Sequence, residues 1–131
     1  MAQRKLSNWL DAYVNYTKES ISPPIYHRWV GVSLLASAMQ RKCWLQWESP
    51  TYPNFYIVLV GLSGCGKGTA MYYGREILDT VGMPLASDSI TREALIREIN
   101  DCGVNSPVAG TQVYHSSLTI YAPELTVFLG Y

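Results

Sequence analysis

The residues of this chain whose types and spacing fit a chemical task lie in one short loop. Residues 61–69 read GLSGCGKGT, after the apolar run FYIVLV at 55–60 and before a stretch with helical periodicity. A glycine-rich turn between a strand and a helix directs backbone N–H groups and the positive end of the helix at one point. That point suits a phosphate, and Lys67 adds a charge that reaches the terminal phosphates of a nucleotide. The loop therefore predicts phosphate binding.

The whole loop is expected to form the binding site. Three of its glycines, Gly61, Gly64 and Gly66, permit positive φ angles and the close approach of a ligand. The alternative is a plain glycine-rich turn that happens to contain a lysine, and the strand and helix expected on either side favour phosphate binding over it. The candidate binding residues are Gly61, Leu62, Ser63, Gly64, Cys65, Gly66, Lys67, Gly68 and Thr69.

Gly68 occupies the position at which such loops usually carry the serine or threonine that ligates Mg²⁺. Thr69 is the nearest substitute, but one residue along a helix turns the side chain by about 100°. Either Mg²⁺ keeps a water molecule there or the local geometry differs. Cys65 lies near a helix amino terminus, which lowers the pKa of a thiol. A small residue that simply fits the loop is the favoured interpretation of Cys65.

Glu124 is the second candidate catalytic residue, beside Lys67. It is the one charged residue after Cys102, and it follows the apolar segment SLTIYA at 117–122. In phosphate-loop enzymes a second strand ends in acidic residues beside the loop, where one holds Mg²⁺ and another polarises the attacking water. Glu124 fits the water-polarising position, and Pro123 stands where the metal-side aspartate is usual. The alternative is a glutamate favoured in the first turn of a helix.

Alternating helices and strands are expected to position these residues. Apolar residues at steps of three and four predict four helices, over 6–19, from Pro23 to about residue 40, over 70–81, and from Thr91 onward with Leu95, Ile96 and Ile99 buried. The expected strands are a β-prone segment at 43–48, the run at 55–60, a short strand at 83–87 and the segment at 117–122. Residues 49–54 read as a turn and residues 101–111 as a loop. This order is typical of an α/β fold.

Composition limits the classes of protein to which the chain can belong. It has 131 residues, of which 48% are apolar, and 10 basic residues balance 10 acidic ones. The net charge therefore provides no general attraction for nucleic acid or membrane. The three cysteines form no C-x-x-C pair, and no segment resembles a secretion signal or a membrane span. We expect a cytoplasmic protein that does not enter a membrane.

Two known families share features with these residues. The nine residues GLSGCGKGT resemble the loop of adenylate kinases, which also carry Gly and Thr after the lysine. A longer resemblance is to the RecA-like ATPase domain of phage and mobile-element primase/helicase-type proteins. It is carried, in order, by PPIYHRWVGVSLLASAMQRK, PNFYIVLVG, the loop, DSITREALI and HSSLTIYAPELTVFLG.

The longer resemblance implies a P-loop NTPase fold with a three-layer core around a parallel sheet. Residues 1–50 would be a helical segment with a short strand, and residues 51–131 would be a partial core. In that family a later strand lies between the loop strand and the acidic strand. We therefore expect an amino-terminal fragment that lacks this strand, the sensor and the arginine finger. Such a fragment, expressed alone, would be poorly soluble or inactive.

Three functions remain open from the sequence. The first, implied by the longer resemblance, is a replicative helicase or primase-associated ATPase that uses ATP and Mg²⁺, forms a homo-oligomeric ring and acts on single-stranded DNA. The second is a nucleotide kinase of the adenylate type. The third is a nucleotide-binding switch with little hydrolysis, which the changes at Gly68 and Pro123 favour.

Overall fold

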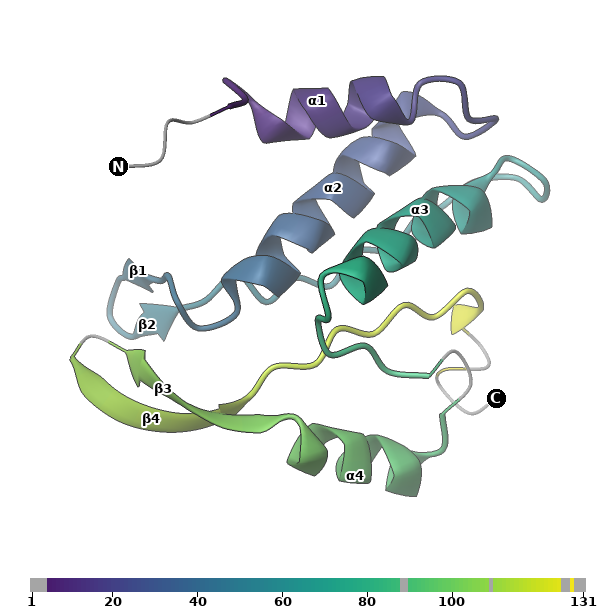
Figure 1. Ribbon diagram of the computed structural model, residues 1–131. Coiled ribbons are helices and arrows are strands. Elements are labelled where there is room, and N and C mark those ends of the chain that lie inside the picture. Colours follow the sequence, from purple (N-terminus) through teal and green to yellow (C-terminus); the bar gives the residue numbers. More distant parts are fainter. Residues whose placement is uncertain (1–4, 88–89, 109, 126–127, 129–131) are drawn as a thin grey trace.

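The computed structural model describes residues 5–87, 90–108, 110–125 and 128. Figure 1 shows three helices in the upper part of the molecule and a hairpin with a fourth helix below them. In chain order the elements are α1 (Trp9–Tyr16), α2 (Pro24–Met39), β1 (Leu45–Gln46), β2 (Pro50–Thr51), α3 (Lys67–Thr80), α4 (Arg92–Asp101), β3 (Gly103–Val108) and β4 (Thr111–Ser116).

Local sequence signals account for where the helices begin. The Asn8 side chain caps α1 by accepting hydrogen bonds from the amides of Leu10 and Asp11. Pro24 is the first residue of α2, where a missing N–H costs nothing. Thr91 caps α4 through the amide of Ala94, as the sequence predicted. The four predicted helices are therefore present, and α1 is shorter than expected.

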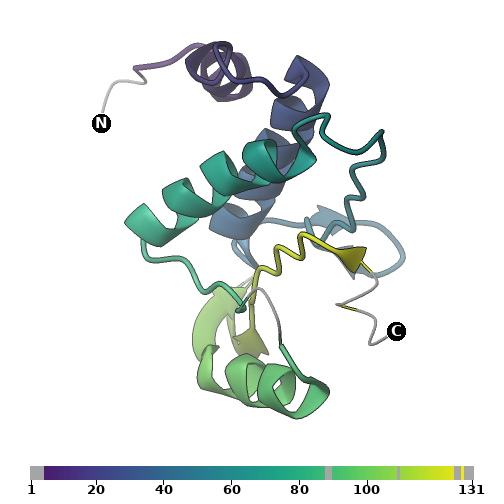
Figure 2. The same cartoon turned by 90° about the vertical axis from the view of Figure 1, so that its right-hand side faces the viewer.

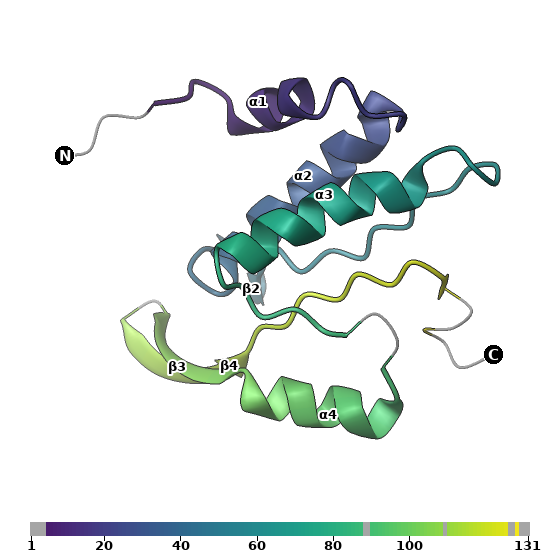
Figure 3. The ribbon, with the colours of Figure 1, turned by 45° about the vertical axis from the view of Figure 1, so that its right-hand side comes forward.

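The three upper helices pack on one another and enclose the core. α1 lies against the first half of α2, where Tyr13 meets the ring of His27 and Asp11 pairs with Arg28. α2 and α3 lie side by side and run in the same direction (Figure 3). The buried residues of this core are Tyr13, Val30, Leu34, Ala70 and Leu78, with Trp9, Tyr26, Leu59, Met71, Ile77, Met83, Leu85 and Tyr121 packed around them.

Extended segments pass beneath these helices. The segment at 117–122 is held to α2 by two hydrogen bonds, one between the hydroxyls of Tyr121 and Ser33 (2.6 Å) and one from Thr119 to Ser37 (2.7 Å). Its other neighbour is the segment at 84–86, which it meets in a single parallel bridge between Leu85 and Thr119. The short strand predicted at 83–87 is thus reduced to one bridged residue.

The predicted parallel sheet of a P-loop core is wrong for this structure. The described residues form two antiparallel sheets of two strands each, β1 with β2 and β3 with β4. The apolar run at 55–60 forms no strand, and within the described residues it makes no hydrogen bond to another backbone group. Tyr56 is fully exposed and Val60 is 81% exposed. A parallel strand is stable when both of its edges and both of its faces are covered, and this run lacks that cover.

The lower part of the molecule also differs from expectation. Residues 103–108, predicted to belong to a loop, pair with 111–116 in a regular hairpin that closes through Gly110 at a φ of 83°. The predicted turn at 49–54 contributes β2. Figure 2 shows this hairpin and α4 at the lower end, apart from the three packed helices. α4 buries no residue, and Ile96 is 51% exposed, so its apolar face is not a buried face as predicted.

The helix that the alternative interpretation of Glu124 would begin lies largely on residues outside the described part of the chain. Of the residues after Glu124 that the structure describes, Leu125 and Phe128 are helical. Among the described residues, no helix combines the length and the apolar character needed to cross a membrane.

Candidate functional site

The glycine-rich loop joins the extended run at 55–60 directly to α3. Gly64 and Gly66 have φ angles of 77° and 80°, a left-handed conformation that favours glycine. Gly66 is the residue that precedes the first turn of α3, and no side chain caps this helix. Leu62 and Ser63 form the exposed tip of the loop. The loop therefore turns sharply and leaves the amino terminus of α3 open.

Three amides at this helix terminus have no partner. Within the described residues, no hydrogen bond uses the backbone N–H groups of Gly66, Gly68 or Thr69, while the amide of Lys67 bonds to the Cys65 thiol. The first amides of a helix carry a partial positive charge and need an acceptor from outside the helix. A Cβ atom built on Gly64 or Gly68 would have no atom within 4 Å, so the space beside them is open. An anion with several oxygen atoms satisfies such donors.

Lys67 adds a full positive charge to the same loop. Its ammonium group donates to the carbonyl oxygens of Gly61 and Leu62, each at 2.8 Å, and lies 3.6 Å from the sulfur of Cys65. The side chain is thus folded back over its own loop. Because carbonyl oxygens are neutral acceptors, a phosphate competes for this ammonium group with a stronger, charge-assisted bond.

The Cys65 thiol lies between two polar groups. Its sulfur is 3.5 Å from the Tyr26 hydroxyl, and the Lys67 ammonium group is on the other side. The hydrogen bond with Tyr26, supported by the charge of Lys67, lowers the pKa of the thiol. The same hydrogen bond raises the pKa of Tyr26. The thiol therefore ionises to the thiolate more readily than the thiol of an ordinary cysteine.

Two residues of the α2 region contact the loop, and the sequence analysis did not single them out. Ser22 donates to the carbonyl of Gly66 at 2.6 Å, and Tyr26 donates to the carbonyl of Val60 at 2.9 Å. They are separated from the loop by about forty residues in sequence. The one available signal was their position at the start of a predicted helix, which does not indicate a partner.

The tight packing explains the glycines differently from the sequence analysis. A Cβ atom on Gly61 would collide with the Tyr26 hydroxyl and with the Cys65 sulfur. One on Gly66 would lie 2.9 Å from the Cα atom of Ser22. Of the three glycines that were expected to make room for a ligand, Gly64 alone faces open space. Gly61 instead leaves room for Tyr26, and Gly66 leaves room for Ser22.

The protein atoms offer little to a magnesium ion. No group of three or more His, Cys, Asp or Glu side chains suited to a metal occurs among the described residues. Gly68 has no hydroxyl, and Thr69 is partly buried in the first turn of α3. Mg²⁺ commonly keeps several waters and binds phosphate oxygens, so water and the phosphates of a nucleotide would supply most of its ligands.

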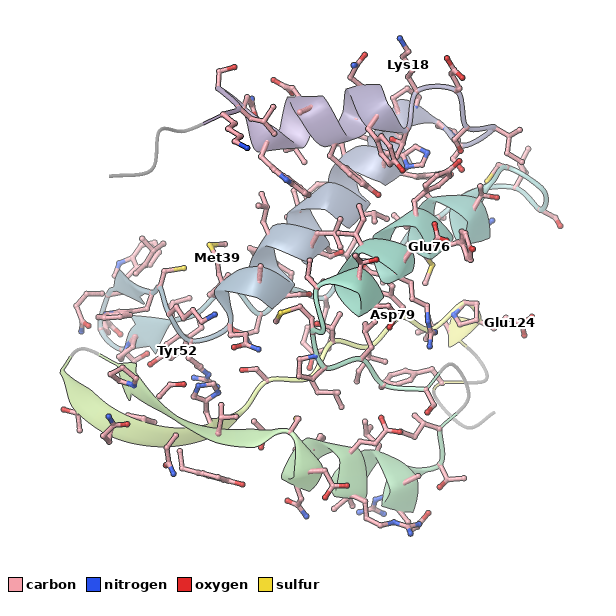
Figure 4. All side chains as sticks on the ribbon, viewed as in Figure 1. Lys18, Met39, Tyr52, Glu76, Asp79 and Glu124 are labelled. Atoms are coloured by element: carbon pink, nitrogen blue, oxygen red, sulfur yellow. The ribbon has the colours of Figure 1, made fainter. Side chains whose placement is uncertain are left out.

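Glu124 lies at the end of the extended segment and at the edge of the molecule (Figure 4). Its side chain is exposed, and its backbone carbonyl accepts a hydrogen bond from the amide of Phe128 at 3.1 Å, which is the start of a helical turn. This is the local structure expected of the helix-start alternative. The catalytic assignment of Glu124 stays a prediction.

A groove connects the loop to the segment that carries Glu124. Its volume is about 660 Å³, and its lining includes residues 54–59, residues 116–123 and part of α2. Of the loop, Lys67 borders the groove, and Pro123 also borders it, whereas Glu124 is not among the lining residues.

No protein-family model, curated protein or solved structure matches the chain.

Proposed function

We propose that this protein binds the phosphates of ATP in the loop at 61–69. The observation that carries the proposal is that three unpaired amides, those of Gly66, Gly68 and Thr69, lie in the same short loop as the Lys67 ammonium group. Backbone donors of this kind suit phosphate oxygens because they are fixed in place before the ligand arrives. The open space beside Gly64 and Gly68 leaves room for the ligand to approach them.

We further propose that the bound ATP is hydrolysed, with Glu124 orienting and polarising the attacking water. Support for this role comes from the groove, whose lining includes Lys67 of the loop and Pro123, the residue before Glu124. The proposed reaction needs Mg²⁺ to neutralise phosphate charge. The described side chains do not form a site for that ion.

The cellular process proposed is replication of a phage or mobile element, with the chain acting in a helicase or primase-associated ATPase. Support comes from the resemblance of five successive segments, from residue 23 to residue 130. On this proposal the protein works in the cytoplasm as a homo-oligomeric ring on single-stranded DNA. The balanced charge of the chain adds no support for DNA binding.

A second candidate function is a nucleotide-binding switch with little hydrolysis. Two observations favour it, namely the missing hydroxyl at Gly68 and the exposed position of Glu124 at the start of a helical turn. Both weaken the metal side of the site and leave the phosphate side intact. The switch would bind ATP as tightly as the ATPase and differ in turnover.

The first test is ATP binding by the wild-type chain and by Lys67→Ala. We expect Lys67→Ala to abolish measurable binding in calorimetry, because it removes the one full positive charge of the loop. Lys42→Ala is the matched control, since Lys42 is an exposed lysine after the far end of α2. Binding that survives Lys67→Ala, or that is lost equally in Lys42→Ala, contradicts the proposed site.

The second test is ATP turnover with and without single-stranded DNA. Stimulation by DNA supports the replication ATPase, and tight binding without turnover supports the switch. Phosphoryl transfer from ATP to a nucleoside monophosphate would replace both with the kinase alternative.

A further inference from the structure

Two residues at the start of α2, one just before the helix and one in its first turn, form hydrogen bonds at both ends of the phosphate loop. Tyr26 reaches Val60, the last residue before the loop, and Ser22 reaches Gly66, the last residue before α3. The first and last parts of the loop are therefore held by two residues, Tyr26 and Ser22, that are four positions apart in sequence. Figure 2 shows the start of α2 beside the start of α3, at the end where the loop runs.

Both contacts are tightly packed, with the Ser22 bond partly buried and the Tyr26 bond exposed, and neither follows from the loop sequence. Ser22 is 6% exposed, and its Cα atom lies so near Gly66 that a side chain at residue 66 would not fit. The Tyr26 hydroxyl occupies the space that a side chain at Gly61 would need. Tyr26 also packs against the hydrophobic core, which fixes the position of its ring.

The geometry points to Ser22 and Tyr26 as positioning residues that hold the phosphate loop in its binding conformation. This inference rests on the proposed function, because it assigns a cause to the arrangement of the donors that would bind ATP. The carbonyl of Gly66 belongs to the peptide that also carries the amide of Lys67, so holding this oxygen fixes the direction of that N–H group. A loop ordered in advance binds more tightly because less conformational entropy is lost on binding.

The inference applies to the phosphates and not to the base of the nucleotide. Among the described residues, the hydroxyls of Ser22 and Tyr26 bond to Val60, Cys65 and Gly66, which belong to the loop or directly precede it. Inorganic tripolyphosphate, which has no base, is therefore expected to lose as much affinity as ATP when these contacts are removed.

The experiment compares dissociation constants for ATP and tripolyphosphate in wild type, Ser22→Ala and Tyr26→Phe. Each substitution removes one hydroxyl, and we expect each to weaken both ligands by about fivefold, the size of one hydrogen bond. Ser87→Ala and Tyr72→Phe are matched controls, since they remove hydroxyls that bond to Glu98 and to Glu76, away from the loop. Both controls are expected to bind within twofold of wild type.

A second readout reports the Tyr26 contact directly. In a chain with Cys43→Ser and Cys102→Ser, Cys65 is the remaining cysteine, and its alkylation rate follows the thiolate fraction. Tyr26→Phe removes the hydrogen bond that lowers the pKa of this thiol, so the pH–rate profile moves to higher pH. Because unfolding would also raise this pKa, the profile is measured under conditions in which Tyr26→Phe is shown to be folded, and Tyr72→Phe is expected to leave it unchanged.

The outcomes separate the two levels of the proposal. If wild type binds neither ligand, the proposed function fails. If wild type binds and Lys67→Ala does not, but Ser22→Ala and Tyr26→Phe bind like wild type, the positioning inference is overturned and the site stands. Losses that the two controls share, or an unchanged alkylation profile in Tyr26→Phe, also overturn the inference.

Discussion

At the scale of single residues, the loop at 61–69 contains two kinds of glycine. Gly64 and Gly68 face open space, whereas Gly61 and Gly66 make room for Tyr26 and Ser22. Sequence reasoning identifies a glycine but does not identify the atom that takes the place of its side chain. The motif predicts a candidate site, and the packing around α2 shows why two of its residues are glycines.

The role of Glu124 is the prediction that belongs to this scale. We expect Glu124→Gln to lower the rate of ATP hydrolysis about a hundredfold or more, the usual contribution of a general base, because an amide cannot accept the proton of the attacking water. ATP affinity is expected to stay within twofold of wild type. Phosphate release and calorimetry measure the two quantities.

Glu76→Gln is the control for this change. Glu76 lies on α3, where it accepts a hydrogen bond from Tyr72 (2.8 Å), and Figure 4 shows it on a different element from Glu124. Its substitution is expected to leave turnover unchanged. Equal turnover in wild type and Glu124→Gln would leave Glu124 with the role of a helix-start residue, which its contact with Phe128 already indicates.

At the scale of elements, the helices followed from sequence, whereas of the predicted strands the segment at 43–48 alone contains a paired strand, β1. Apolar periodicity and caps such as Thr91 are local, so they predicted all four helices. The hairpin of β3 and β4 was missed because Gly, Asn, Ser and Pro within GVNSPV were interpreted as loop residues. Pairing with β4 supplies hydrogen bonds that composition does not reveal.

The two glycines inside α3 give a prediction at this scale. Gly68 has open space at its Cβ position, so Gly68→Ala is expected to stabilise the protein by about 0.5 to 1 kcal/mol through helix propensity. At Gly74 a Cβ atom would lie 2.5 Å from Val30 and 2.9 Å from the Tyr121 hydroxyl. There the crowding outweighs the propensity, and we expect Gly74→Ala to destabilise by about 1 kcal/mol or more.

Urea unfolding of both variants measures these changes, and each variant serves as the control for the other. The same substitution in the same helix is expected to act in opposite directions. A stabilising Gly74→Ala would show that α2, α3 and the segment at 117–122 are less closely packed than the structure indicates.

At the scale of the whole molecule, one histidine lies where three helices meet. His27 of α2 is 1% exposed, and its ring contacts Tyr13 of α1 and Tyr73 of α3 edge to face. Neither ring nitrogen has a hydrogen-bond partner among the described residues. Burial therefore lowers the pKa of His27 from its ordinary value of 6.5.

This burial predicts how the stability of the fold depends on pH. Because the pKa is lower in the folded state, the unfolded chain binds the proton more readily as the pH falls below about 6.5. The free energy of unfolding is thus expected to decrease between pH 7 and pH 5. Denaturant titrations at several pH values measure it, with His27→Phe as the variant that cannot titrate. An equal pH dependence in the two proteins would assign the effect to other groups.

The sequence by itself determined the four helices and the loop, because their signals lie within a few residues of one another. Tertiary structure decided the rest. The run at 55–60 has the composition of a buried strand, yet its state depends on neighbours that must pair with it, and the described residues supply none. The contacts of Ser22 and Tyr26 join segments about forty residues apart, a distance over which residue spacing gives no information.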